Sequence, residues 1–332
     1  MKCCFRNNIL LTFSDYGDKS ELGIYKNKKS RELISVDCID LINVETKIIA
    51  NNLLLWIKAN GIDLIYNYET NIGIFNHVVI RHNEKMQFML EFYFHEYDET
   101  VINRLKCWNM STYNIVSMYY QIENKNKNDF RAEFRLLKGE YYLYYNICDK
   151  TIGIKAGSFF QTNNAELNIM YNDIMNKFNK NDKFIFLDLY CGVGVMSIIM
   201  AQYYKRCIGI EINQNAINVA EHNMVKNNIS NCNFICNPVE EIINNNHINI
   251  TPITDEDIII FVNPPRRGLY KTVIQKLNSL KSSGKIKQIL YLSCCLKTLE
   301  RDLELFDYDS KILEIYDMFP KTNHKEYLVE LF

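Results

Sequence analysis

The stretch FIFLDLYCGVG at residues 184–194 decides the fold of this chain. Its apolar run leads through Asp188 and Tyr190 into a Gly-x-Gly turn, and helical spacing begins directly afterwards. Glycines at such a turn let the backbone approach a ligand at the carboxyl end of a strand. Because a single Gly-x-Gly is more often only a tight turn, the other strand ends must decide whether a ligand binds here.

The same alternation of strand and helix continues to the end of the sequence. Apolar runs of strand length lie at residues 184–190, 207–212, 233–236, 257–262, 288–293, 312–318 and 327–331. Helical spacing occurs at residues 163–178, 195–204, 213–227, 269–282 and 296–306. The last two runs have no helix between them. This order predicts an α/β fold for residues 151–332, a doubly wound, seven-stranded, Rossmann-like sheet of the S-adenosylmethionine (SAM)-dependent methyltransferase type.

Residues 1–150 predict a smaller domain of mixed α+β type. Strand-like runs lie at residues 10–13, 78–81, 88–94 and 141–145, and one helical pattern covers residues 51–59. The pattern that starts the second domain sets in after residue 150, and we place the domain boundary there.

Charge and cysteine usage narrow the class of protein. The 38 Lys and Arg residues are balanced by 39 Asp and Glu, which argues against a protein that coats nucleic acid non-specifically. The eleven cysteines are scattered through apolar runs with no signal peptide before them, so we expect reduced thiols and a cytoplasmic location. No apolar stretch approaches the roughly 20 residues that span a bilayer, so we expect no membrane partner.

The second predicted strand ends in Glu211, where a carboxylate is placed to accept hydrogen bonds from ribose hydroxyls. A dinucleotide-dependent dehydrogenase would have a third glycine shortly after the first two, but residues 195–197 are Val-Met-Ser. The loop and Glu211 together therefore favour SAM over NAD as the cofactor.

The fourth predicted strand is followed by NPPRRG at residues 263–268. A stiff Pro-Pro turn would hold Asn263 at the carboxyl edge of the sheet. Methyltransferases that modify amino groups carry an aromatic residue after Asn-Pro-Pro, and Arg266 takes that place here. Methylation of an exocyclic amine is therefore disfavoured, and the two arginines are either surface charges or contacts to a phosphate.

Two further residues belong to the same predicted edge. Cys294 follows the fifth strand, where a thiol with a lowered pKa can act as a nucleophile, although most of the cysteines must be incidental. Glu326 stands where a polar turn leads into the last strand; a carboxylate there is a candidate base, or only a solvated side chain. Asp317 is the next candidate for the base.

Taken together, these segments resemble the RNA uracil carbon-5 methyltransferase family, and most closely its bacterial branch that acts on 23S ribosomal RNA. The resemblance extends from residues 156–163 (AGSFFQTN) through the glycine loop, Glu211, the NPPRRG segment and residues 291–294 (YLSC) to Glu326. It implies that Gln161, Tyr190, Glu211 and Asn263 bind SAM, that Cys294 is the nucleophile and that Glu326 is the general base. It also implies an RNA substrate, ribosomal RNA ahead of transfer RNA, and we expect a monomer.

In the chemistry that this resemblance implies, a thiolate adds to carbon 6 of uracil, carbon 5 takes the methyl group, and a base removes the carbon-5 proton. The target uracil has to be unstacked or flipped out of a helix. An RNA cytosine carbon-5 methyltransferase is the alternative enzyme, but that class resembles a pattern with a second cysteine in the strand-four motif, which is absent from residues 263–268.

The sequence departs from the family after the catalytic cysteine, where relatives carry Asn and often Pro, and this chain has Cys295 and Leu296. A non-catalytic RNA-binding or chaperone module that keeps the fold is the alternative from a different class. Intact Cys294, Glu326 and Gln161 count against it.

The amino-terminal part also departs from the family. Residues 5–8 (FRNN) resemble a signature that relatives precede with three cysteines of an iron–sulfur cluster, and Cys38 corresponds to the fourth. Only Cys3 and Cys4 precede the signature here. We therefore expect no iron–sulfur cluster, no other metal, and no amino-terminal β-barrel RNA-binding domain of the kind that many relatives carry.

Overall fold

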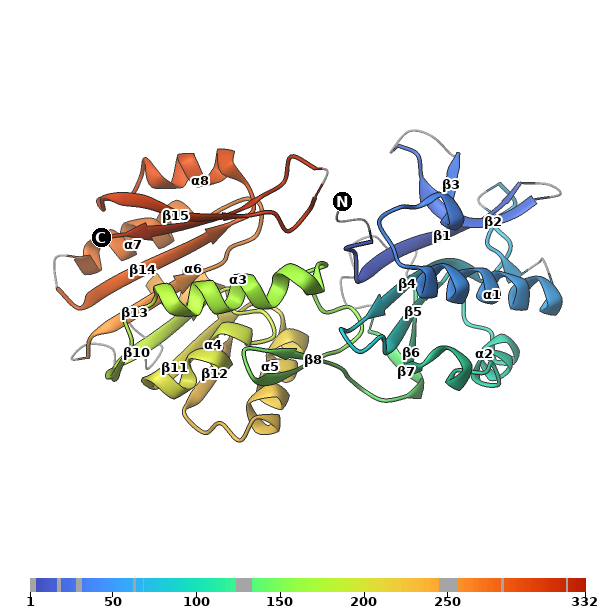
Figure 1. Cartoon of the computed structure of the whole chain (residues 1–332), viewed down its shortest axis with the longest axis horizontal. Coiled ribbons are helices and arrows are strands. Elements are labelled where there is room, and N and C mark those ends of the chain that lie inside the picture. Colours follow the sequence, from blue (N-terminus) through green and yellow to red (C-terminus); the bar gives the residue numbers. More distant parts are fainter. Residues whose placement is uncertain are drawn as a thin grey trace. The chain divides into compact units, whose positions relative to one another are not determined.

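A computed structural model of the chain describes residues 4–16, 19–27, 32–61, 64–67, 69–123, 133–244, 256–281, 284–320 and 322–332. The chain divides into two compact units, which are described separately (Figure 1). Unit 1 comprises Met1–Tyr145, Lys155–Gly157 and Thr162–Asn164, and unit 2 comprises Asn146–Ile154, Ser158–Gln161 and Ala165–Phe332. The chain thus passes between the units more than once within residues 145–165.

Unit 2 is built on a seven-stranded sheet with the strand order β12-β11-β10-β13-β14-β16-β15. Its strands are β10 (Asn181–Leu189), β11 (Tyr204–Glu211), β12 (Cys232–Cys236), β13 (Ile258–Val262), β14 (Ile286–Ser293), β15 (Ser310–Tyr316) and β16 (Glu326–Leu331). The first five run parallel, whereas β16 is antiparallel to both β14 and β15. The carboxyl ends of the five parallel strands therefore share one edge of the sheet.

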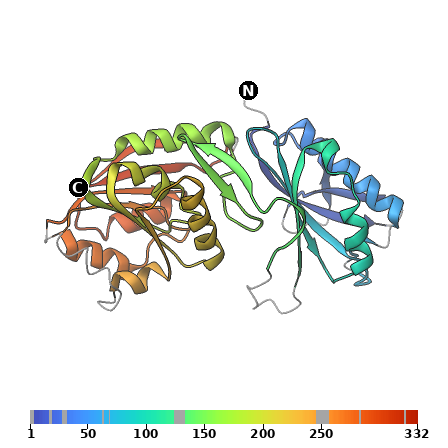
Figure 2. The same cartoon turned by 90° about the horizontal axis from the view of Figure 1, so that it is seen from below.

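Helices cover both faces of this sheet (Figure 2). They are α3 (Asn164–Lys177), α4 (Val195–Met200), α5 (Gln214–Lys226), α6 (Val239–Asn244), α7 (Lys271–Lys281) and α8 (Leu296–Leu303). One face carries the core cluster to which α6, α7 and α8 contribute, including Ile185, Leu187 and Leu189 of β10. The alternate residue Phe186 points to the other face and contacts Phe178, which follows α3.

The predicted fold class of this part of the chain is confirmed. Each of the seven predicted strands is present, with ends that differ by a few residues, and the five predicted helices are present. The helix predicted at residues 195–204 is shorter than expected, because α4 ends at Met200 and Ala201–Tyr203 continue as a 3-10 helix. It also missed the short helix α6.

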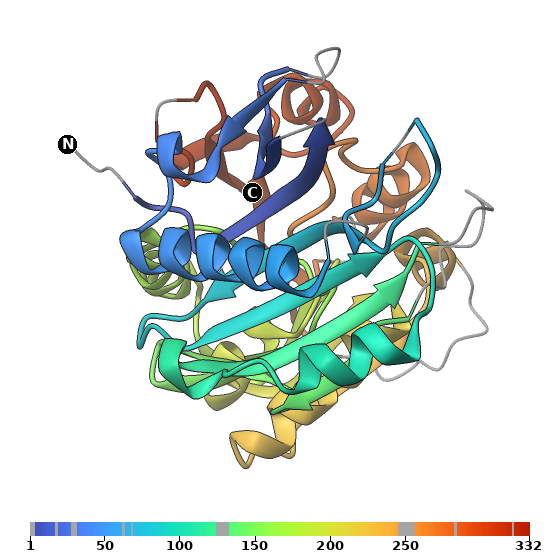
Figure 3. The same ribbon diagram turned by 90° about the vertical axis from the view of Figure 1, so that its right-hand side faces the viewer.

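Unit 1 contains a second seven-stranded sheet, with the order β3-β2-β1-β4-β5-β6-β7. Its strands are β1 (Asn8–Tyr16), β2 (Lys19–Tyr25), β3 (Leu33–Ser35), β4 (Phe75–His82), β5 (Phe88–Phe94), β6 (Ile115–Ile122) and β7 (Arg135–Gly139). All neighbours are antiparallel except β5 and β6. Helices α1 (Val44–Asn60) and α2 (Glu99–Lys106) lie against one face of it (Figure 3).

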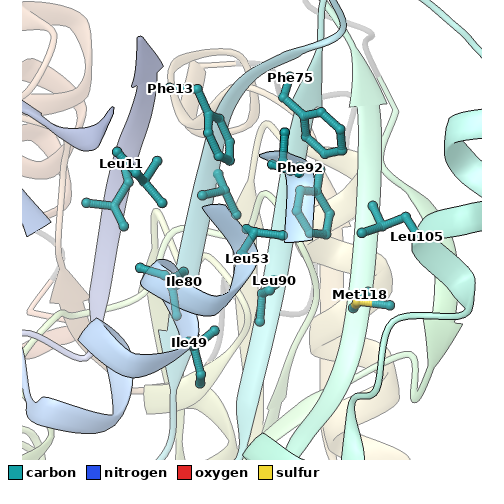
Figure 4. Close-up of a cluster of buried hydrophobic side chains, with 14 of the residues drawn as sticks. Leu11, Phe13, Ile49, Leu53, Phe75, Ile80, Leu90, Phe92, Leu105 and Met118 are labelled. Carbon is teal, nitrogen blue, oxygen red and sulfur yellow. The ribbon is translucent and has the colours of Figure 1, made fainter. Parts of the chain in front are cut away.

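The core of unit 1 lies between that face and the two helices (Figure 4). Along β5, Phe88, Leu90, Phe92 and Phe94 alternate toward the helices, as the period of two in a strand requires. Burying one such aromatic or aliphatic side chain contributes about 1.5–3 kcal/mol. The α+β character expected for this region is present, but β2, β3, β6, β7 and α2 were not predicted.

The expected strand at residues 141–145 is displaced. Strand β8 (Leu143–Ile147) pairs only with β9 (Lys150–Ile154), in a separate two-stranded sheet. This hairpin lies where the chain leaves unit 1, and β9 is part of unit 2.

Candidate active site

The glycine loop follows β10 at the shared strand edge of unit 2. Tyr190, Gly192 and Gly194 all have positive φ values, of 63°, 54° and 79°. A Cβ at Gly194 would lie 2.9 Å from the Cβ of Ala220 on α5, so a larger residue there would push loop and helix apart. A Cβ at Gly192 would meet nothing within 4 Å, so space is open above the backbone at this position.

Glu211 lies at the end of β11 and is fixed to this loop. Its Oε2 accepts a hydrogen bond from Gly192 N at 3.3 Å, and its Oε1 accepts one from Asn213 N at 3.0 Å. Each carboxylate oxygen has a second lone pair, so both can still accept from a ligand hydroxyl.

The turn after β13 is anchored by a buried carboxylate, Asp302, to which the sequence analysis assigned no role. Asn263 N donates to Leu189 O at 3.2 Å, which places Asn263 beside the glycine loop. The fully buried Asp302 of α8 accepts from Leu269 N at 2.7 Å and from the Tyr291 hydroxyl at 2.8 Å. A side chain at Gly268 would clash with this carboxylate. Asp302 therefore fixes the end of the NPPRRG segment.

Asp188, near the end of β10, fixes the start of α4 in a similar way. Its carboxylate is buried and accepts from the backbone N of Ser197 at 3.1 Å and from the Ser197 hydroxyl at 2.7 Å. Burial raises the pKa of Asp188 to about 7. The signal that could have identified this contact is the serine that stands nine residues after the acidic strand end.

The residues at this edge fit a polar cofactor such as SAM. The Tyr190 hydroxyl is a buried oxygen with no hydrogen-bond partner in the described part of the chain. Buried polar atoms are almost always paired, so an unpaired one suggests a ligand or water that completes the site. The site therefore combines an unpaired hydroxyl at Tyr190, open space at Gly192 and carboxylate oxygens of Glu211 that can accept hydrogen bonds. These are the features that bind the nucleoside part of such a cofactor.

Cys294 and Glu326 lie near each other where two antiparallel strands meet. Ser293 of β14 and Tyr327 of β16 form the last pair of the two strands, and Cys294 and Glu326 are the residues next to that pair. Glu326 is near enough to raise the pKa of the Cys294 thiol. The sheet register therefore brings the predicted nucleophile close to the predicted base.

Gln161 is the third residue of this group. Its side chain is buried, and its Nε2 donates to Oε1 of Glu326 at 3.4 Å. The structure thus places a residue that was predicted to bind the cofactor in contact with the predicted base.

The electrostatic environment suits Glu326 as a base, whereas it raises the pKa of Cys294 instead of lowering it as the sequence analysis expected of a nucleophile. Burial raises the pKa of Glu326 to about 7, and the contacts with Gln161 and Arg266 act in the opposite direction. Burial and the nearby Glu326 also raise the pKa of the Cys294 thiol, whereas Arg266 lowers it. A base whose pKa lies near neutral pH suits general base catalysis.

The neighbouring thiol is in a different environment. Cys295 occupies the N-cap position of α8, and hydrogen bonds from Thr298 together with backbone N–H groups lower its pKa. Cys295 is therefore the more easily ionised thiol, but Cys294 is the neighbour of Glu326. The alternative base Asp317 is half exposed and forms an ion pair with Lys325 at 2.7 Å.

In the parts that the structure describes, no three His, Cys, Asp or Glu side chains are grouped so that they could hold a metal ion. Cys3 lies outside the described residues, and the expected lack of an iron–sulfur cluster stays a prediction. Every helix among the described residues is too short or too polar to cross a membrane.

A family model described as tRNA (uracil-5-)-methyltransferase matches residues 152–331, more than half of the chain. A protein of Fusobacterium nucleatum described as an uncharacterized RNA methyltransferase is 30% identical to this chain. The alignment has 336 positions and covers 97% of this chain and 68% of that protein. One of Staphylococcus epidermidis with the same description is 29% identical and covers 92% of this chain and 66% of its own length. The chain spans about two thirds of the length of these relatives.

Among solved structures, the chain resembles the tRNA (uracil-54, C5)-methyltransferase of Pyrococcus abyssi in complex with S-adenosyl-L-homocysteine. The TM-score is 0.76 at 22% identity, over 99% of this chain and 76% of that one, so this likeness supports the fold. The resemblance found in the sequence is confirmed at the level of an RNA uracil-5 methyltransferase family, whose members use SAM; the ribosomal branch stays a prediction. The chain belongs to the tRNA (uracil-5-)-methyltransferase family.

Proposed function

We propose that this chain transfers a methyl group from SAM to carbon 5 of a uracil in RNA and forms 5-methyluridine through a covalent adduct on Cys294. The observation that carries the proposal is the pairing of Ser293 with Tyr327, which leaves Cys294 and Glu326 as neighbours just beyond the last pair of β14 and β16. A thiol and a carboxyl with a raised pKa at one edge are the two groups that this reaction requires.

The two residues act in sequence. Cys294 loses its proton to solvent and its sulfur forms a bond to carbon 6 of the uracil, which moves the electrons of the carbon 5–carbon 6 double bond toward carbon 5. When bound, SAM would supply the methyl group that carbon 5 takes, with S-adenosylhomocysteine as the leaving group. Glu326 then removes the proton from carbon 5, the double bond re-forms, and the Cys294 sulfur leaves carbon 6 as a thiolate.

Four residues are proposed to bind the cofactor: Gln161, Tyr190, Glu211 and Asn263. The positions of Glu211 and Asn263 beside the glycine loop support their part in this proposal. Because Gln161 also donates to Glu326, we propose that its amide additionally keeps the base oriented. Arg266 lowers the pKa of Cys294 and Glu326 alike, so it favours the charged form of both.

We propose ribosomal RNA as the substrate, unit 1 as a part that contacts it, and a monomer that acts in the cytoplasm. The NPPRRG segment supports the ribosomal branch. The description of the family model and the name of the Pyrococcus abyssi enzyme both refer to tRNA for those proteins, so transfer RNA is the competing substrate.

The test uses SAM with a deuterated methyl group, unmodified 23S ribosomal RNA and unmodified transfer RNA in separate reactions. After nuclease digestion, mass spectrometry should find labelled 5-methyluridine in the ribosomal RNA, and none should form with the Cys294→Ala variant. Label in transfer RNA alone would overturn the substrate proposal, and labelled 5-methylcytidine would favour the cytosine enzyme. RNA binding without any methyl transfer would favour the non-catalytic module.

A further inference from the structure

Two asparagines one turn apart, Asn223 of α5 and Asn227 at its C-cap, hold the edge of strand β9. The side chain of Asn223 accepts from Gly153 N at 2.7 Å and donates to Gly153 O at 3.0 Å. Asn227 does the same for Thr151, with distances of 2.9 and 2.8 Å. Each amide thus pairs with one strand residue as a neighbouring strand would.

The two asparagines differ in their third hydrogen bond. Asn227 Nδ2 donates to Asn223 O of its own helix at 2.8 Å. Asn223 Nδ2 instead donates at 3.1 Å to Val193 O, which lies between the two glycines of the loop. Asn223 is also fully buried, so both of its amide hydrogens are used and no water can replace either contact.

The loop around Val193 needs support of this kind. Its backbone has positive φ at Tyr190, Gly192 and Gly194, a conformation that other residue types rarely adopt. The strand side holds it through Cys191 N, which donates to Ile210 O at 3.0 Å, and through the bond from Gly192 N to Glu211. Asn223 adds a hydrogen bond from helix α5 to the Val193 carbonyl of the loop.

We propose that Asn223 is a positioning residue for SAM binding: it fixes the Val193 carbonyl, and with it the open backbone at Gly192, against strand β9. This inference rests on the proposed function, since it assigns a role in holding the cofactor loop of that site. Asparagine suits the task because it combines two donated hydrogens with an acceptor on a short side chain, whereas aspartate lacks the donors. Asn227 forms the same pair of hydrogen bonds with β9 but has no contact with the loop.

The experiment compares Asn223→Ala with Asn227→Ala in the full chain. Each variant loses three hydrogen bonds, two of them to β9, so both should melt at a lower temperature than the wild type. Only Asn223→Ala should also bind SAM more weakly in calorimetric titration, by about tenfold, as expected for a loop that has lost a buried hydrogen bond. Its KM for SAM should rise by a similar factor, while kcat at saturating SAM stays within about twofold.

Hydrogen exchange followed by mass spectrometry gives a second readout. Peptides that cover the glycine loop should exchange faster in Asn223→Ala and at the wild-type rate in Asn227→Ala. If Asn223→Ala does not fold, Asn223→Ser takes its place, since the shorter hydroxyl cannot span both contacts.

The outcomes separate the inference from the function on which it rests. Failure of the wild-type chain to bind SAM would overturn the proposed function. Wild-type binding with an unchanged dissociation constant in the Asn223 variant would overturn the inference alone. Equal weakening in both variants would show that the asparagines act only through the stability of β9.

Discussion

The two seven-stranded sheets of this chain have the same number of strands but differ in strand direction. In unit 2, five parallel strands end at one edge; Glu211 is the last residue of β11, and the glycine loop, Asn263 and Cys294 directly follow the ends of β10, β13 and β14. In unit 1, nearly all neighbours are antiparallel, so successive strand ends alternate between opposite edges. Its main buried polar pair, Arg81 and Glu91, lies within neighbouring strands at 3.1 Å instead of at their ends.

This difference shows where activity and stability should respond to mutation. Strand-end side chains in a parallel sheet converge without being part of the core, so replacing them should change catalysis more than folding. A buried ion pair in the middle of a sheet should do the reverse.

The largest effect is expected at Cys294. Cys294→Ala should reduce methyl transfer by about 10⁴-fold or more, because removing a nucleophile removes the covalent route. Cys295→Ala should keep activity within about tenfold. Although the Cys295 thiol ionises more easily, Cys294 and not Cys295 is the neighbour of Glu326. Steady-state assays of both variants at one pH check this. Loss of activity in Cys295→Ala alone would reverse the two roles.

Glu326→Gln should act at a later step. If Glu326 removes the carbon-5 proton, methylation proceeds in the variant while release slows by about 10²–10⁴-fold. A methylated protein–RNA adduct should then survive denaturing electrophoresis, and the double variant with Cys294→Ala should not form it. Wild-type turnover without a trapped adduct would mean that Asp317 or another group is the base.

The contrast reverses at the ion pair of unit 1. Arg81 and Glu91 have side chains only 5% and 2% exposed, and Gly157 N also donates to Glu91 at 3.2 Å. Arg81→Ala should lower the free energy of unfolding by about 3–5 kcal/mol, because it leaves a buried carboxylate without its partner. The dissociation constant for SAM, measured on the folded fraction, should not change. The double variant Arg81→Met, Glu91→Leu should recover much of the stability; if it does not, the pair is more than a local structural contact.

A smaller effect on stability is expected at the functional edge, with a defined dependence on pH. Burial raises the pKa of Glu326 from 4.5 to about 7, so the folded chain holds a proton that the unfolded chain releases between these values. The free energy of unfolding should therefore fall as pH rises through this window. Glu326→Gln should be more stable than the wild type at pH 8 by about 1–3 kcal/mol, and the gain should vanish near pH 4. Urea denaturation across this range measures it, and equal stability at pH 8 would argue against a raised pKa.

The sequence predicted unit 2 better than unit 1 for physical reasons. Parallel strands covered on both faces appear as continuous apolar runs, as in Ile258–Val262, and these are easy to recognise. Strand β6 (Ile115–Ile122) has apolar or aromatic residues on both faces, which removes the alternation expected of an antiparallel strand. Helix α2 has only eight residues, although the Asp98 N-cap, which accepts from Val101 N at 3.0 Å, is a signal that could have located it.

The site was predictable as far as strand ends could be found. Cys294 and Glu326 were named from their places beside two predicted strands, and the register of those strands accounts for their meeting. The contact between Gln161 and Glu326 joins residues 165 positions apart, and no local pattern encodes it. The role of Asp302 depends in the same way on how α8 packs against the turn after β13.

The most direct test of the account is to identify the residue that becomes linked to RNA. The chain is incubated with SAM and with substrate RNA that contains 5-fluorouridine, from which carbon 5 cannot release a proton, and the cross-linked peptide is sequenced by mass spectrometry. A methylated fluorouridine attached to the sulfur of Cys294 is expected. An adduct on Cys295, or methyl transfer to ordinary RNA with no adduct on the fluorinated RNA, would contradict it.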